Sequence, residues 1–522
     1  MSDALRQGIA APRFGPSFVF LRTIPWRRVA IAGVLSALLA GILVFTDGNL
    51  MAGGAAVALI AILAITWYRV DWGFLIFFFF VILFDQFDIP GFYPLTTRVS
   101  YFLNLNAIGY IPTIDQGVMN PLELQLLLIL VIWVVTGIFR RKLETFKVPL
   151  KGPMLVLYVA ILGSIIYGLA RGGDLIISLW ETRAMFYLGA MILLVPQLIQ
   201  TEAQVKAVIW TAIAGVTIKA LQGAGRFASL GFSFGRWPDI YETLTNHEDP
   251  VFIVTLFLFV MALTLFGDRG RQRKVLLYLL IPLFVGYVAG QRRAAYAAFM
   301  ASLGAFIFLL PSKQRKAVLK VLLVFGVFFA MYLGVFWDSY SRLGSVAQQF
   351  KATITEEGGV RGEKDIKSTL YRKIENYNLG RTFENAPIVG ISFGRRYDKV
   401  LTLWGSSFAL GDYVAHNQIL WLFVQMGALG AFAFWFFFNA YVFRSSLIYA
   451  TLSDPYFKSV CAICILAVIN QMVVSYVDMQ LTYYRNMVYL GVLMGMVPVI
   501  HRLDDAKKAA AGEPPAPSTA AG

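Results

Sequence analysis

Long apolar runs separated by short polar segments dominate the chain. A helix that crosses a bilayer needs about 20 mostly apolar residues, and we identify about fourteen runs of this kind. The pattern predicts an all-α integral membrane protein with about fourteen transmembrane helices and one long, partly helical loop before the twelfth. The predicted spans are residues 29–45, 52–68, 72–84, 122–139, 153–169, 184–199, 205–221, 251–266, 275–290, 294–310, 321–337, 416–443, 460–476 and 486–500.

Composition and charge placement agree with this fold class. Of the 522 residues, 58% are hydrophobic and 14% are charged, whereas soluble domains are about half apolar and about a quarter charged. The net charge of +15 comes from short basic clusters between apolar runs, which is typical of cytoplasmic loops. We therefore expect a lipid bilayer as partner and no nucleic acid.

The basic clusters also divide the chain by side. We expect residues 1–28 to form a cytoplasmic N-terminal segment and residues 29–500 to form the membrane domain. Residues 338–415 are expected to be a large outer loop, and residues 501–522 a disordered cytoplasmic tail rich in Ala, Pro and Gly.

Several short motifs predict local structure. Asn120–Glu123 combines a cap residue, a proline at the first helical position and an acidic third residue, and Asp249–Pro250 resembles the start of the eighth span. Residues 368–372 are expected to be helical, and residues 387–394 to form a turn against the membrane. His247 and its acidic neighbours lack the usual ligand spacing, so we expect no metal site.

Arginines on the outer side are candidates for anion binding. Arg183 and the pair Arg292–Arg293 stand at predicted starts of inward-running spans. A helix N-terminus presents free N–H groups and partial positive charge, and a guanidinium added there suits a phosphate group. The alternatives are an arginine that reaches lipid headgroups or pairs with an outer carboxylate such as Glu181. Both alternatives remain open at this stage.

His416 and Asn417 lie where the outer loop meets the twelfth span. The chain has only three histidines, and an ionisable residue at the mouth of a span is a candidate for function. Histidine is the side chain best suited to proton transfer near neutral pH. The alternative is that His416 and Asn417 only cap the helix.

A set of motifs in one order resembles a known family. The set comprises Gln291–Ala294 at a span start, Tyr371–Arg372 in the outer loop, the segment 387–394, and His416–Asn417 leading to Gly427 and Gly430. Over roughly residues 251–430 the chain resembles the bacterial O-antigen ligase and O-antigen polymerase superfamily. Ser392 stands where glycine is common in that family.

The resemblance implies a membrane glycosyltransferase of the GT-C type in the bacterial inner membrane, with its active site on the periplasmic face. The donor would be a glycan on undecaprenyl pyrophosphate, and the acceptor would be lipid A–core or a lipid-linked glycan. Arg183 and Arg292 or Arg293 would hold the pyrophosphate, and His416 would act at the acceptor hydroxyl. Asn417, Arg372 and Glu181 are candidate contacts for the acceptor or the loop. Transfer would invert the anomeric carbon, without metal or other cofactor.

Two other functions compete with this interpretation. A transporter of lipid-linked glycans would also need arginines for pyrophosphate, but it favours charges near mid-membrane and repeated halves. A scaffold of an export complex would explain the spans but not the arginines and His416. Within the transferase interpretation, ligase and polymerase remain open, as do the sugar and the oligomeric state.

Overall fold

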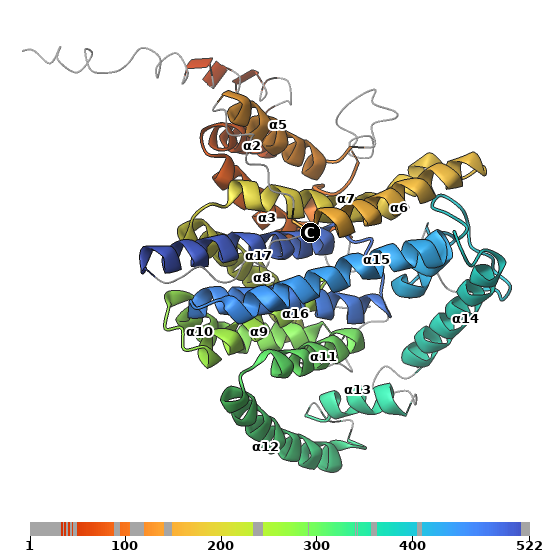
Figure 1. Cartoon of the computed structure of the whole chain (residues 1–522). Coiled ribbons are helices and arrows are strands. Elements are labelled where there is room, and N and C mark those ends of the chain that lie inside the picture. Colours follow the sequence, from red (N-terminus) through yellow and green to blue (C-terminus); the bar gives the residue numbers. More distant parts are fainter. Residues whose placement is uncertain are drawn as a thin grey trace, which may run out of the picture. The chain divides into compact units, whose positions relative to one another are not determined.

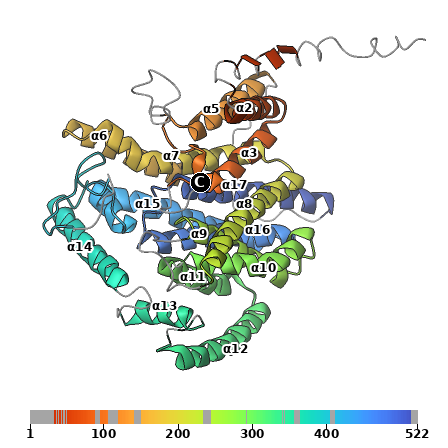
Figure 2. The ribbon, with the colours of Figure 1, turned by 180° about the vertical axis from the view of Figure 1, so that it is seen from behind.

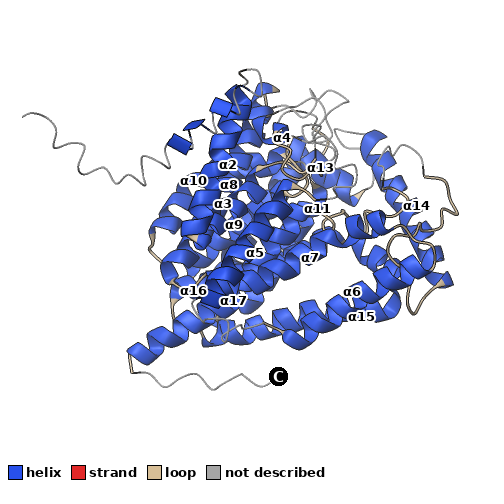
Figure 3. Cartoon of the chain, turned by 90° about the horizontal axis from the view of Figure 1, so that it is seen from above, coloured by secondary structure: helices blue, strands red, loops and turns tan. Residues whose placement is uncertain are grey.

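The computed structural model describes residues 50–87, 94–104, 119–139, 149–232, 244–290, 292–339, 341, 343–355, 363–403 and 410–512, with scattered positions between 33 and 48. Throughout these residues the secondary structure is helix and loop, without strands (Figure 3). The first predicted span, 29–45, lies largely outside the described residues. Each of the other thirteen predicted spans coincides with one helix, as the apolar pattern requires. These helices are α2 (Leu50–Tyr68), α3 (Val70–Leu83), α5 (Pro121–Phe139), α6 (Lys151–Ala170), α7 (Leu175–Leu198), α8 (Glu202–Ser229), α9 (Asp249–Leu265), α10 (Arg271–Ala289), α11 (Arg293–Leu309), α12 (Ser312–Phe336), α15 (Gln418–Thr451), α16 (Pro455–Ser475) and α17 (Tyr484–Ala510).

The chain comprises two compact units, residues 1–69 and residues 70–522. In the second unit, α16 lies at the centre and packs against α9, α11, α15 and α17 (Figure 1). Helix α7 runs beside α17, and α6 runs beside α15. The opposite view shows α8 next to α10, and α8 also packs against α3 (Figure 2). Three further helices, α4 (Leu95–Arg98), α13 (Ser345–Ile354) and α14 (Glu363–Asn385), lie in connecting segments.

The distribution of apolar side chains identifies an integral membrane protein. Eight of the described helices are long and apolar enough to cross a bilayer, and five more are shorter apolar helices. On α12, large apolar side chains are exposed, including Leu323 at 71% and Val335 at 74%. Charged side chains such as Arg485 and Glu248 are instead fully buried. Apolar exposure with charged burial is expected where lipid, and not water, surrounds the helices.

Several helix ends differ from the sequence prediction, and three of these differences change the interpretation of a named segment. Helix α7 begins at Leu175, nine residues before the predicted start at Ala184, because Asp174 caps it through the Ile177 N–H. Helix α17 continues to Ala510, so residues 501–510, predicted as disordered tail, are helical; the rest of that tail beyond residue 512 lies outside the described part. Asp249 is the first residue of α9 rather than its cap.

Two local predictions are confirmed. Asn120 and Glu123 form a capping box, with the Glu123 N–H donating to the Asn120 side chain at 2.9 Å and the Asn120 N–H donating to the Glu123 carboxylate at 3.0 Å. Residues 368–372 lie inside α14, as expected. Both features depend on neighbours in sequence, which is why the sequence alone predicts them.

Candidate functional site

The turn at residues 387–394 fills a break in α15. Gly427 has φ 64° and ψ −170°, so the helix ladder is interrupted there. A Cβ atom at Gly427 would lie 2.2 Å from the Ile388 carbonyl oxygen, so only glycine fits. The turn replaces the missing helical bonds with four backbone bonds of 2.8–3.2 Å, from Ile391 to Val424, Ser392 to Gln425, Ala428 to Pro387 and Leu429 to Ile388.

Buried contacts from α6 and α7 hold this turn. Glu181 on α7 accepts hydrogen bonds from the Gly394 N–H at 2.6 Å and from the Gln425 side chain at 2.9 Å. Ser392 has φ 80°, a backbone conformation that favours glycine, which explains why glycine is common at this position in the family it resembles. Glu181 is therefore a contact of the loop, and it fixes the N-terminal half of α15.

His416 lies immediately before α15 and pairs with a carboxylate from α14. Its Nδ1 lies 3.1 and 3.2 Å from the two carboxylate oxygens of Glu375, and its backbone N–H donates to the same carboxylate at 2.9 Å. Glu375 is buried, whereas 26% of the His416 side chain is exposed. The Tyr371 ring meets the imidazole edge-on at 5.5 Å between centroids. The carboxylate thus orients the ring and leaves Nε2 as the nitrogen that can meet a substrate.

Asn417 has the capping role that was the alternative interpretation of this pair. Its side-chain oxygen accepts a hydrogen bond from the Leu420 N–H at 3.1 Å, as expected of an N-cap. His416, one residue earlier, makes no such cap and turns to Glu375 instead. The two neighbouring residues therefore have different tasks.

Arginines from two elements gather near this histidine. Arg292 is the N-cap of α11 and Arg293 is its first residue, as the sequence predicted. Burial lowers the pKa of Arg372 on α14, Asp478 opposes this effect, and Arg292 and Arg293 add to it. Arg372 therefore lies within electrostatic range of both α11 arginines and of Asp478.

This arginine cluster (Arg292, Arg293 and Arg372) carries an excess of positive charge. Arg372 lies within electrostatic range of two carboxylates, Asp478 and Glu375, and Asp478 is also within range of Arg292. Nε and Nη2 of Arg292 are buried and have no hydrogen-bond partner among the described residues. Two N–H groups on one edge of a guanidinium match two oxygens of a phosphate. Such an arrangement suits a polyanionic group.

Arg183 occupies a different position from the one predicted. It lies two turns inside α7 rather than at a helix N-terminus, so free N–H groups do not surround it. Its Nε pairs with Glu123 at 3.2 Å, and its Nη1 donates to Asn104 at 3.1 Å. Pairing with an outer carboxylate was the alternative left open by the sequence, with Glu123 in place of Glu181.

Two adjacent tyrosines join the surroundings of Arg183 to a second histidine. Tyr484 stacks on Trp180, whose ring also lies 5.6 Å from the Arg183 guanidinium. Tyr483 meets the His247 ring edge-on at 5.9 Å. Arg183 thus lies close to the start of α17.

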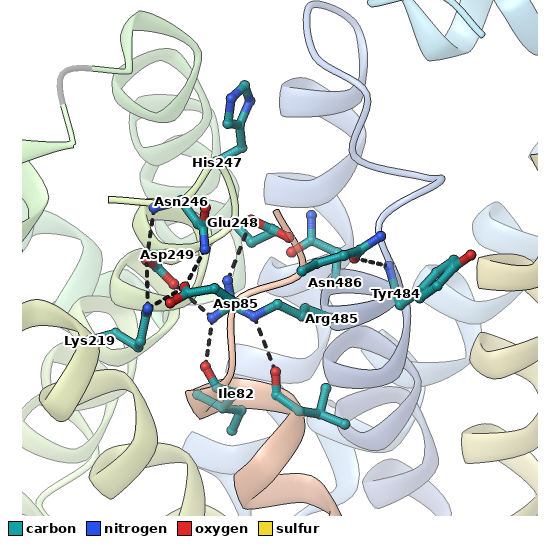
Figure 4. Close-up of polar contacts among 12 residues, drawn as sticks. Ile82, Asp85, Lys219, Asn246, His247, Glu248, Asp249, Tyr484, Arg485 and Asn486 are labelled. Carbon is teal, nitrogen blue, oxygen red and sulfur yellow. Dashed lines mark hydrogen bonds and ion pairs between the residues drawn. The ribbon is translucent and has the colours of Figure 1, made fainter. Parts of the chain in front are cut away.

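A buried network of charges connects α3, α8, α9 and α17 beside His247 (Figure 4). Arg485 on α17 donates to Asp249 at 2.8 Å, lies 3.5 Å from Glu248, and donates to the carbonyls that end α3, Val81 and Ile82. Lys219 on α8 pairs with Asp85. Burial raises the pKa of Glu248 to about 7, against the lowering effect of Arg485. The network fixes the ends of α3, α9 and α17 relative to α8.

An apolar cavity of about 740 Å³ lies between α9, α10, α11 and α12. It extends along α10 from Leu277 to Tyr287, and Val321 of α12 also lines it. None of the predicted site residues lines this cavity. The cavity ends on α10 at Tyr287, which is five residues before Arg292 in the sequence.

Two carboxylates at the site, Glu375 and Asp478, do not follow from the sequence motifs. Glu375 lies three residues after Arg372 on α14, and this spacing places both on one helix face, which is the signal that could have found it. Asp478 lies in the turn between α16 and α17, and no local pattern links it to His247, 231 residues away.

Comparison with known proteins agrees with the resemblance. Residues 276–435 match the family model described as O-antigen ligase. This range includes Arg292, Arg293, Arg372, Glu375 and His416, but neither Arg183 nor Asp478. No curated protein matches the chain. The match supports the resemblance of this segment to the O-antigen ligase and O-antigen polymerase superfamily and, at that level, a membrane enzyme that transfers glycans.

Proposed function

We propose that the protein transfers a glycan from undecaprenyl pyrophosphate to an acceptor hydroxyl on the periplasmic face of the bacterial inner membrane, with both termini in the cytoplasm. The observation that carries this proposal is the meeting of the arginine cluster with the pair His416–Glu375. One half of the site suits a pyrophosphate, and the other half suits removal of a proton from a hydroxyl. Glycan transfer from a lipid pyrophosphate needs both.

The proton-transfer half follows from the orientation of His416. When Nδ1–H donates to Glu375, the neutral ring carries its lone pair on Nε2. This nitrogen can take the proton of an acceptor hydroxyl as the hydroxyl oxygen attacks the anomeric carbon. Glu375 stabilises the imidazolium that results. A single displacement inverts the configuration at that carbon.

The pyrophosphate half follows from the arginine cluster. Charge develops on the leaving oxygen as the glycosidic bond breaks, and fixed guanidinium groups stabilise that charge without rearrangement. The Arg292 edge with its two N–H groups supports a contact with two phosphate oxygens. Arg183 remains a candidate for holding another part of the donor, near Trp180 and Tyr484.

The apolar cavity supports placement of the donor lipid. From Tyr287 to Leu277 the cavity follows α10 for about 15 Å, at about 1.5 Å per residue. A polyprenyl chain attached to a pyrophosphate at Arg292 would enter the cavity at Tyr287 and follow α10 into the membrane.

Turnover of a purified undecaprenyl-pyrophosphate glycan in nanodiscs tests the proposal. We expect His416→Ala to lower kcat by about 10²- to 10⁴-fold, the usual contribution of a general base. Loss of a charged hydrogen bond in Arg292→Gln should raise the KM for the donor by about 10- to 100-fold. His501→Ala changes the histidine paired with Asp505 at the far end of α17 and should leave both constants unchanged.

The outcomes separate the competing functions. Release of undecaprenyl pyrophosphate by wild-type protein, lost in His416→Ala, supports a transferase. A ladder of products without lipid A–core then identifies a polymerase, and dependence on lipid A–core identifies a ligase. Binding of the donor without turnover by wild-type protein and variant alike would favour a transporter and overturn the proposal.

A further inference from the structure

Three helix ends bring a second histidine to the arginine cluster. Val251 of α9, Ala298 of α11 and Val474 of α16 form a small buried cluster. His247 lies four residues before Val251, and Asp478 lies four residues after Val474. Arg292 and Arg293 stand at the start of α11, about one and a half turns before Ala298. Packing of the three helices therefore places these groups at the same end of the bundle.

The close approach of α10 to the His247 segment supports this placement. A Cβ atom at Gly290 would lie 2.8 Å from Pro250 and 3.0 Å from the Thr245 hydroxyl. Gly290 is two residues before Arg292, while Thr245 and Pro250 flank His247 on both sides. The end of α10 and the segment around His247 thus pack directly against each other, and the absence of a side chain at Gly290 permits this contact.

His247 and Asp478 form a pair of the same kind as His416 and Glu375. Nδ1 of His247 lies 3.1 and 3.2 Å from the Asp478 carboxylate oxygens. Asp478 is buried, and 28% of the His247 side chain is exposed. His247 points away from the network that its neighbours Glu248 and Asp249 form with Arg485 (Figure 4).

Asp478 is the negatively charged partner that can hold a proton on the His247 ring. Burial alone raises the pKa of Asp478, but His247, Arg292 and Arg372 outweigh burial and hold that pKa well below the usual range. The ionised carboxylate stabilises an imidazolium beside it and the neighbouring arginines oppose it, whereas a bound pyrophosphate adds negative charge that favours it. The His247 ring also contacts the Tyr483 ring. A further positive charge, Arg293, follows Arg292 in the chain.

Protonation decides what His247 can do. With Nδ1–H directed to Asp478, the neutral ring has only a lone pair on Nε2, whereas the imidazolium has an N–H there. An N–H at Nε2 can donate to an anionic oxygen. The arginines that neighbour Asp478 are those assigned to the pyrophosphate, so this donor lies on the leaving-group side of the site.

We propose that His247, oriented by Asp478, donates a hydrogen bond from its protonated ring to the leaving pyrophosphate. This inference rests on the proposed function. In the step, the acceptor oxygen bonds to the anomeric carbon and its proton passes to Nε2 of His416. The bond from that carbon to the pyrophosphate oxygen breaks, and its electron pair stays on the oxygen. His247 stabilises the new charge and keeps its proton.

The pH dependence of turnover in nanodiscs tests this role. His416 must be neutral and His247 protonated, so kcat in the wild type should fall at both low and high pH. His247→Gln retains an N–H donor but has no titrating ring. We expect its kcat to be about 10²-fold lower, with the fall at high pH lost and the fall at low pH kept.

Two companion variants separate catalysis from folding. Asp478→Asn keeps the shape of the side chain, and it should lower kcat and move the high-pH limb to lower pH, because the imidazolium loses its counter-charge. His501→Gln alters the third histidine, paired with Asp505 at 3.3 Å, and should match the wild type. The melting temperature of each purified variant shows whether it is folded.

The results distinguish failure of this inference from failure of the proposed function. If the wild type turns over the donor and His247→Gln, correctly folded, retains the wild-type kcat and high-pH limb, His247 has no part in the reaction. A fall in kcat with the high-pH limb unchanged would reduce His247 to a structural residue and also overturn the inference. If the wild type shows no turnover, the proposed function itself fails.

Discussion

Replacing Glu375 with Gln tests the orientation of His416 most directly. The carboxylate accepts the His416 N–H at 2.9 Å and faces Nδ1 at 3.1 and 3.2 Å. A carboxylate has only acceptors, whereas an amide has one oxygen and one NH₂ group. In Glu375→Gln, the amide oxygen can accept from the backbone N–H only by turning its NH₂ group toward Nδ1. An NH₂ group at this position favours an accepting Nδ1, so the proton moves to Nε2 and the lone pair needed for catalysis is lost.

The size of the effect follows from the role of the base. A general base contributes about 10²- to 10⁴-fold to the rate, which corresponds to about 3–5 kcal/mol at 1.36 kcal/mol per decade. The substitution is isosteric and leaves the arginine cluster unchanged. We therefore expect kcat to fall by about that factor, with the KM for the donor changed by less than about threefold.

The assay measures undecaprenyl pyrophosphate released in nanodiscs at several donor concentrations. Glu384→Gln is the matched control, because Glu384 lies on the same helix, is 61% exposed and pairs only with nearby Arg381 among the described contacts. It should behave as wild type. A Glu375→Gln protein that keeps its kcat, or loses only donor affinity, would refute the assignment of His416 as an oriented base.

Two further predictions concern stability. Burial raises the pKa of Glu248 from 4.5 to about 7. Its contribution to the free energy of unfolding is therefore full below about pH 4.5 and is lost as pH rises through about 7, a change of about 3 kcal/mol. In Glu248→Gln the melting temperature should vary less between about pH 5 and 8 than in the wild type, and an unchanged pH dependence would contradict this. Gly427→Ala places a Cβ 2.2 Å from the Ile388 oxygen at a positive φ, so it should destabilise by about 2 kcal/mol or more, and an unaltered melting temperature would exclude the tight fit.

Features that depend on neighbouring residues follow from the sequence itself. Apolar runs of about 20 residues predict thirteen of the described helices, because the bilayer selects such runs by local composition alone. The capping box at Asn120–Glu123 and the position of Arg292 at the start of α11 depend on a few adjacent residues. The motifs from Arg292 to His416 also predict the family, which the O-antigen ligase match confirms.

Pairs between distant residues required the tertiary structure. Glu375 reaches His416 across 41 residues and Asp478 reaches His247 across 231, and no local pattern encodes such distances. Hydropathy predicts Arg183 at a helix start because it marks only the most apolar part of a span, whereas α7 begins nine residues before the predicted start, at its cap Asp174. Apolar patterning thus determines which segments enter the membrane. Which charges then meet depends on how the helices pack, since each buried charge must find its partner on whichever helix lies beside it.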